Sequence, residues 1–264
     1  MFDADYTNSP VRMKHNLGTY LKQAYIVMKN EMVKFTRGKK ILVYGALMVL
    51  VLALLTGMPY LFGGELPDTT TTLSSYYASF VVILVLLFAT LFSSTSLVSE
   101  FEERTALILF TRPIKKSSIL LGKLMASMVV GIIAVGIYYL VTAIISFIVA
   151  GGVASDLFVS FGLAVLYLFC MSGIALLISS VMKKGSTAAI ITFIIPLMIF
   201  SIISTILMMN DVATWWLPLD ASNAILSLFD PTVVTNVSQS AGVLAVWGFV
   251  TTIIAYLFFR KRNF

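Results

Sequence analysis

The chain of 264 residues is 59% hydrophobic and only 11% charged, and its mean hydropathy is +0.98. These values exclude a soluble globular protein and indicate one integral membrane domain, because the length leaves little room beyond several spans of about 20 residues each. The net charge is +6, and the single cysteine, Cys170, excludes an intrachain disulfide and a cysteine metal cluster.

The first 40 residues carry an amphipathic pattern ahead of the first long apolar run. Apolar residues recur every three or four positions and are Leu17, Leu21, Ala24, Met28, Met32 and Phe35. Basic residues surround this stripe, so the pattern predicts a helix lying on a membrane surface; a basic tail without fixed structure is the alternative. We therefore expect residues 1–40 to form a cytosolic N-terminus with an interfacial helix, followed by a transmembrane domain over 41–264.

Six apolar segments have the length and composition of membrane-spanning helices. They lie near 41–62, 76–98, 119–150, 157–181, 187–208 and 241–259. The third is long enough to tilt or to extend beyond the membrane, and Lys123 near its start favours extension. Pro196 is expected to kink the fifth. The predicted fold is an all-α integral membrane protein with six transmembrane helices.

The basic residues fall on one side of the predicted spans. Residues 1–40 hold eight of them, the loop 99–123 five, the next loop two and the C-terminal tail three, which accounts for all eighteen. The charged residues of the opposite loops are all acidic and are Glu65, Asp68, Asp156, Asp211, Asp220 and Asp230. The positive-inside rule then predicts a multi-pass cell-membrane protein with both termini in the cytosol. The net charge reflects this topology, and no nucleic acid partner is needed to explain it.

The outer loop over 209–240 is too long for a simple connector. Trp215, Trp216 and the apolar run from Ala224 to Phe229 predict short helices at the outer interface, where indole rings prefer to lie. A re-entrant hairpin and a surface loop anchored by the two tryptophans are both compatible with this pattern.

The loop between the second and third spans carries more chemistry than a turn requires. Residues 99–123 read SEFEERTALILFTRPIKKSSILLGK and hold three of the twelve acids and five of the eighteen bases. Glu100, Glu102 and Glu103 favour the start of a short helix, because carboxylates oppose the positive end of the helix dipole, and Pro113 ends it. The pattern predicts a short cytosolic coupling helix.

Several kinds of chemistry are absent from the sequence. No Lys, Arg, Asp, Glu or His lies deep within the predicted spans, whereas ion-coupled transporters place such residues near the midplane. There is no G-x-x-x-x-G-K-[ST] motif, so the chain is not expected to hydrolyse ATP alone. The only histidine, His15, precedes the first helix and is expected to be solvated or interfacial rather than a ligand or a base. We therefore predict no catalytic residue and no metal ligand.

The stretch from Glu100 to Thr105, the pair Arg112-Pro113 and the segment Leu120 to Lys123 resemble the signature loop of ABC-2 type permeases, the membrane subunits of ABC exporters. The family pattern is approximately E-x-E-x-G-T-L-E-x-L-L-x-x-P, followed by a polar link and L-x-G-K. The positions that match are Glu100, Glu102, Thr105, Pro113, Gly122 and Lys123. Two positions differ, because Arg104 replaces a glycine and Leu107 replaces a glutamate.

The resemblance implies a membrane subunit that dimerises with itself or with a similar permease. Two separate ATPase subunits would bind ATP and Mg²⁺, so this chain would hold no cofactor. The residues implied in docking the ATPase are Glu100, Glu102, Glu103, Arg104, Thr105, Leu107, Arg112 and Pro113. The family also has an N-terminal interfacial helix and short re-entrant helices between its fifth and sixth spans.

Small polar residues mark two places within the spans. Ser93, Ser94, Thr95 and Ser96 form a polar patch at the cytosolic end of the second span, where they are a candidate substrate path. The alternative is that these hydroxyls bond neighbouring helices or their own backbone. Ser127 and Gly131, four residues apart in the third span, indicate close helix packing.

Three classes of function fit the sequence. The first is the permease of an ATP-driven exporter. The second is a permease-like transmitter, which would pass ATPase movements to a partner outside the cytosol. The third is a membrane enzyme or channel unrelated to ABC transporters. The substrate is not readable from the residues.

Overall fold

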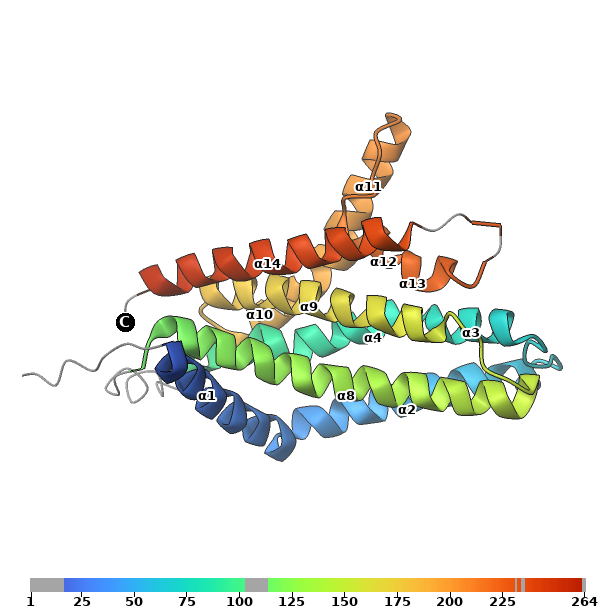
Figure 1. The fold of residues 1–264 in the computed structure, drawn as a ribbon, viewed down its shortest axis with the longest axis horizontal. Helices are drawn as coiled ribbons and strands as arrows, with labels where there is room; N and C mark the ends of the chain where they lie inside the picture. The colour runs from blue at the N-terminus through green and yellow to red at the C-terminus, as the bar shows by residue number, and fades with distance from the viewer. Residues whose placement is uncertain (1–16, 103–113, 231, 234–235, 263–264) are drawn as a thin grey trace, which may run out of the picture.

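A computed structural model describes residues 17–102, 114–230, 232–233 and 236–262. The helices that lie outside the membrane-spanning set are α1 (Leu17–Arg37), α12 (Pro218–Ser222) and α13 (Ala224–Ser227). Long helices run side by side in a bundle, and α1 crosses one end of it obliquely (Figure 1).

Six stretches of the described chain are long and apolar enough to cross a membrane. The unbroken ones are α2 (Lys39–Leu61), α8 (Lys116–Ala150), α9 (Leu157–Val181) and α14 (Val237–Lys261). The second span joins α3 (Thr70–Ala78), α4 (Val81–Phe88), η1 (Ala89–Ser93), α5 (Ser94–Ser96) and α6 (Val98–Glu102), whereas the fifth joins α10 (Gly185–Ile194), η2 (Ile195–Ile199) and α11 (Phe200–Met209). The prediction of six spans and an all-α fold is confirmed. The second span begins earlier than expected, at Thr70, because Thr69 caps its first turn by accepting from the N–H of Thr72.

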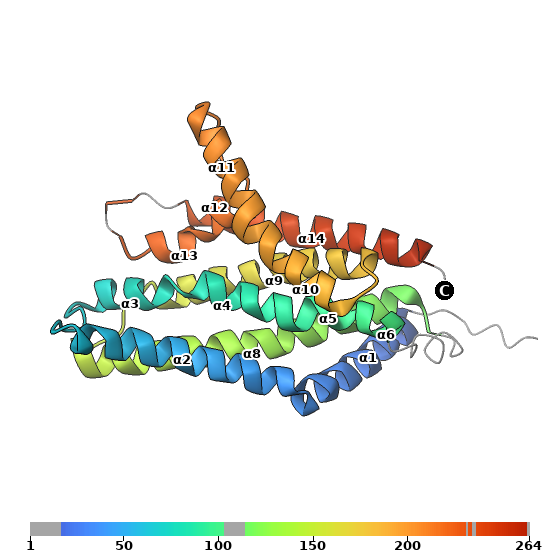
Figure 2. The ribbon, with the colours of Figure 1, turned by 180° about the vertical axis from the view of Figure 1, so that it is seen from behind.

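The two interrupted spans each contain one π-helical turn, η1 and η2. In η2 the interruption includes Pro196, which has no N–H to donate to the preceding turn. After this turn α11 diverges from the neighbouring α14, as both views show (Figures 1 and 2). The predicted kink in the fifth span therefore lies at Pro196.

Glycine allows the central helices to approach one another closely. A Cβ on Gly173 of α9 would lie 2.5 Å from Thr251 Oγ1 of α14, and a Cβ on Gly131 of α8 would lie 2.6 Å from the Leu168 side chain. Both distances are too short for a real side chain, so both glycines mark close crossings; at Gly173 the backbone oxygen of Gly248, 2.9 Å away, also excludes a Cβ. The packing role predicted for Gly131 is confirmed.

The segment between the fifth and sixth spans contains the short helices α12 and α13. Trp216 donates its indole N–H to the backbone oxygen of Ala213, and Trp247 of α14 donates to the backbone oxygen of Trp216. The short helices are thus present, and their depth in the membrane stays a prediction.

Candidate functional site

A cluster of opposite charges joins three helices at the end of the bundle where α1 begins and α14 ends. We call this end, which carries Lys39, Lys40, Glu102, Lys116 and Lys261, the basic end (Figures 1 and 2). Lys123 of α8 lies between two carboxylates, with its Nζ 2.8 Å from Glu31 Oε2 of α1 and 3.0 Å from Glu100 Oε1 of α6. The Nζ of Lys34 lies 3.8 Å from the same oxygen of Glu100. We call Glu31, Lys34, Glu100 and Lys123 the charge cluster.

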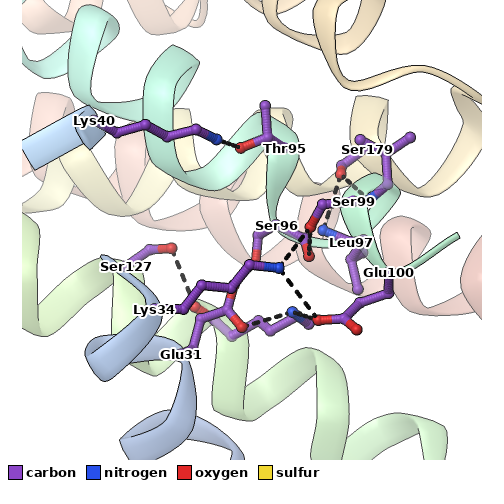
Figure 3. Close-up of polar contacts among 12 residues, drawn as sticks. Glu31, Lys34, Lys40, Thr95, Ser96, Leu97, Ser99, Glu100, Ser127 and Ser179 are labelled. Atoms are coloured by element: carbon purple, nitrogen blue, oxygen red, sulfur yellow. Dashed lines mark hydrogen bonds and ion pairs between the residues drawn. The ribbon is translucent and has the colours of Figure 1, made fainter. Parts of the chain in front are cut away.

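The centre of the charge cluster is withdrawn from solvent. Lys123 is 1% exposed and Glu31 is 5% exposed. Both carboxylate oxygens of Glu31 are used. Oε1 accepts from the Ser96 hydroxyl at 2.9 Å (Figure 3), and Oε2 accepts from Lys123 Nζ at 2.8 Å. A buried charge is costly unless it is paired and hydrogen-bonded, so each member requires the others to stay in place.

The residue before Lys123 explains how α1 comes close enough to reach it. A Cβ on Gly122 would lie 2.6 Å from the backbone oxygen of Ala24 and 2.7 Å from the Cβ of Val27. Any larger residue would therefore push α1 away from α8. Gly122 thus sets the close crossing of the two helices, and Lys123 supplies the ion pair next to it.

The segment that carries Glu100 is fixed on both sides. Ser179 of α9 accepts from the backbone N–H groups of Leu97 and Val98 at 3.2 and 3.1 Å, where α5 gives way to α6 (Figure 3). At the other end of α6, Glu102 Oε2 accepts from the N–H of Gly185 at 2.9 Å. This contact satisfies an amide at the start of α10 that has no partner within its own helix.

Two residues of the predicted docking set lie in the described part of the chain. Glu100 and Glu102 both have partners within the chain, in Lys123 and in the N–H of Gly185. The others lie outside the described residues and are Glu103, Arg104, Thr105, Leu107, Arg112 and Pro113. The predicted coupling helix also falls there, so ATPase docking stays a prediction.

The hydroxyl patch on the second span is engaged inside the chain. Ser93 donates to Ser172 of α9 at 3.2 Å, Ser94 donates to the backbone oxygen of Thr90, and Ser96 donates to Glu31. Ser93, Ser94 and Ser96 are buried. This geometry matches the alternative weighed from the sequence, in which the hydroxyls bond neighbouring helices and their own backbone. Thr95 is half-buried; its hydroxyl likewise donates to its own helix, at the backbone oxygen of Leu91 (3.2 Å), and it also accepts from Lys40 at 2.6 Å.

Sequence reasoning missed Glu31. The predicted apolar stripe includes Leu21, which is 60% exposed, whereas the buried face of α1 runs through Ala24, Val27, Glu31 and Phe35. An acid four residues before Phe35 on this face was the available signal, because a carboxylate among buried positions calls for a partner. Lys123, interpreted as a sign that the third span extends beyond the membrane, is that partner.

The described residues contain no group of three or more side chains suited to holding a metal ion. The charge cluster and the hydrogen bonds beside it fix the flanks of residues 103–113 to α1, α8, α9 and α10. Such contacts can transmit a movement from one helix to another.

Comparison with known proteins assigns nearly the whole chain to one family. A family model described as "ABC-2 family transporter protein" matches residues 25–264, a range that includes α1 from Tyr25 onward and all six spans. No curated protein matches the chain significantly. The family assignment argues against the membrane enzyme or channel unrelated to ABC transporters. With a match over nearly its full length, this multi-pass membrane protein belongs to the ABC-2 family of transporter proteins.

Proposed function

We propose that the chain is the permease subunit of an ATP-driven exporter, and that a separate ATPase docks on residues 103–113. The observation that carries this proposal is the anchoring of both flanks of that segment. On one side Glu100 and Glu102 hold α6 to α8 and α10, and on the other side Ser118 of α8 donates to the backbone oxygen of Tyr20 in α1. A displacement of the segment would therefore move several helices together, as a rigid-body transmission requires.

The distribution of basic residues supports the orientation of the chain in the membrane. The basic residues that the structure describes lie in α1, at the starts of α2 and α8, between α9 and α10 and at the end of α14, so the positive-inside rule supports a cytosolic location for the basic end and for both termini. ATP and Mg²⁺ would then be held by the ATPase on the cytosolic side. Because ABC-2 permeases generally work with an ATPase subunit, we propose an assembly of two ATPase copies and two permeases. The second permease would be a copy of this chain or a similar one.

Reconstituted vesicles test the proposal. We expect vesicles that contain the chain alone to move no substrate under a proton or sodium gradient, because no Lys, Arg, Asp, Glu or His lies deep within the predicted spans. Transport should appear only after the ATPase and ATP are added on the side of Glu100, and with that side outward it is measured as uptake into the lumen. Gradient-driven transport by the chain alone would contradict the proposal.

Two variants separate docking from folding in the same vesicles. Glu103→Lys should reduce ATPase binding and ATP-driven uptake, whereas Glu65→Lys, an equal charge reversal in the loop between α2 and α3, should leave both unchanged. Equal behaviour of the two variants would count against docking near residue 103. ATP turnover by the complete assembly without any cargo would instead support the transmitter hypothesis.

A further inference from the structure

The three tryptophans of the chain line one cavity, which we call the tryptophan cavity. Its volume is about 410 Å³, and small-molecule sites in proteins begin at about 300 Å³. Trp215 and Trp216 come from the segment before α12, and Trp247 comes from α14. Figures 1 and 2 show α12 beside the first turns of α14, away from the basic end.

Contacts within the chain hold two of the three indole groups. Trp216 donates its N–H to the backbone oxygen of Ala213 at 2.9 Å, and Trp247 donates to the backbone oxygen of Trp216 at 2.8 Å. Phe200 packs against Trp247 with ring centroids 5.9 Å apart. The preference of indole rings for a membrane interface accounts for their level, but it does not account for their convergence from two segments on one cavity.

Among the described residues, no charged side chain lines the tryptophan cavity. Val243 and Val246 add apolar surface, and the hydroxyl of Ser238 donates to Asn236 at 3.0 Å. The side-chain amide of Gln239 has no hydrogen bond within the described part of the chain. The cavity therefore offers a ligand aromatic and apolar surface with one available amide.

The chain around the tryptophan cavity carries negative charge. Between Lys184 and Arg260 the sequence contains no Lys, Arg or His, and its charged residues there are Asp211, Asp220 and Asp230. Asp211 and Asp220 lie four residues to either side of the two adjacent tryptophans. A negative field of this kind attracts cations and disfavours a phosphate or a carboxylate.

The lining selects one kind of cation. A primary ammonium or a guanidinium carries N–H donors, which need acceptors in place of the water that they leave, and this cavity provides no carboxylate. A quaternary ammonium has no N–H donor and is attracted to the faces of aromatic rings, tryptophan above all. Aromatic cages are the usual means by which proteins recognise such groups.

We propose that the tryptophan cavity binds a quaternary ammonium group, with choline as the representative ligand. The rings of Trp215, Trp216 and Trp247 contact the trimethylammonium, and the amide of Gln239 contacts the oxygen next to it. The proposal goes beyond the exporter function, because it depends neither on an ATPase nor on the direction of transport.

Tryptophan fluorescence of the unaltered chain tests the site, because all three tryptophans line the cavity. The full chain in a maltoside detergent is titrated with choline chloride and with the uncharged analogue in which a tert-butyl group replaces the trimethylammonium. We expect a saturable change with choline and at least tenfold weaker binding of the analogue. Three ring contacts of about 0.5 kcal/mol each exceed the roughly 1.4 kcal/mol that a tenfold ratio requires.

Two outcomes of this titration would overturn the proposal. Equal binding of choline and its uncharged analogue would show that the cavity recognises apolar shape alone. A change of the same size with sodium chloride at equal ionic strength would show a general effect of salt, whereas we expect sodium chloride to leave the emission unchanged.

A variant with a matched control locates the binding. Trp215→Leu removes one ring and should weaken choline binding about two- to fivefold, measured through the two remaining tryptophans. Phe158→Leu removes an exposed ring of α9 that does not line the cavity and should leave the affinity unchanged. Equal losses in the two variants would contradict the site, because choline would then respond to exposed rings in general.

Short-chain phospholipids identify the source of the quaternary group. Dihexanoyl phosphatidylcholine that binds more tightly than free choline would assign the site to a lipid, and equally tight binding of free choline would assign it to a soluble ligand. Dihexanoyl phosphatidylethanolamine, which keeps its N–H donors, should bind more weakly than the phosphatidylcholine. Equal binding of the two lipids, or no binding of either choline compound, would overturn the proposal.

Discussion

The charge cluster and the outer half of the fifth span are held in different ways. At the cluster, α1 is fixed to α8 by a buried ion pair and by a backbone approach that only Gly122 allows. In the fifth span only 17% of the most apolar window is buried, and α11 leaves the bundle with Ile202 and Ile206 more than half exposed. Its contact with α12 includes a hydrogen bond from Ser204 to Asp220 at 2.7 Å.

The difference shows which kinds of contact fix a helix to its neighbours in a membrane protein. An apolar side chain gains little by choosing protein over lipid, because both surroundings are apolar. A buried carboxylate does not have that freedom, since without Lys123 it would lose its partner. Substitutions should therefore be costly at the cluster and mild along α11.

The largest effect is expected for Lys123→Met. This change removes the partner of two carboxylates and should lower the free energy of unfolding by about 3–5 kcal/mol. Denaturant titration of the chain in detergent, followed by circular dichroism, measures the loss. Lys22→Met removes an exposed lysine of α1 as the control and should change stability by about 0.5 kcal/mol or less. A loss of the same small size for Lys123→Met would show that the ion pairs do not hold the junction.

A smaller loss is expected for Gly122→Ala. The added Cβ would overlap Ala24 and Val27, so α1 must shift, and overpacking of this kind costs about 1–3 kcal/mol. Gly45→Ala in α2 is the matched control, because no atom lies within 4 Å of a Cβ added there and alanine favours the helix. Thermal melting compares the two variants, and equal melting temperatures would refute the close crossing.

The smallest effect is expected for Ile202→Ala in α11. The side chain is 55% exposed, so its truncation in the isolated chain should change the free energy of unfolding by about 0.5 kcal/mol or less. The same denaturant titration measures it. A loss above about 2 kcal/mol, the range for truncating a buried isoleucine, would show that α11 packs against protein.

Much of the fold could be predicted because hydropathy reports where apolar segments meet lipid. The six spans, the helix before them and the kink at Pro196 all follow from local pattern. The divergence of α11 could not be predicted, because its apolar residues are compatible with either lipid or protein as a neighbour. The sequence alone likewise did not reveal which hydroxyls of Ser93 to Ser96 face protein.

The candidate site was predictable in part. The resemblance drew attention to Glu100, Glu102, Gly122 and Lys123, and the structure places Glu100 beside Lys123 and Glu102 beside Gly185. Glu31 was missed because the ion pair depends on how α1 crosses α8, which sequence spacing within α1 does not specify. The role of residues 103–113 in docking stays a prediction, since these residues lie outside the described chain.

A double-mutant cycle between Glu31→Gln and Lys123→Met tests most directly whether this ion pair holds α1 to α8. The free energy of unfolding is measured for the original chain, both single variants and the double variant. We predict a coupling energy of about 1–3 kcal/mol, because the two groups lie 2.8 Å apart and are almost fully buried. Additive losses, with a coupling energy within about 0.5 kcal/mol of zero, would contradict the account.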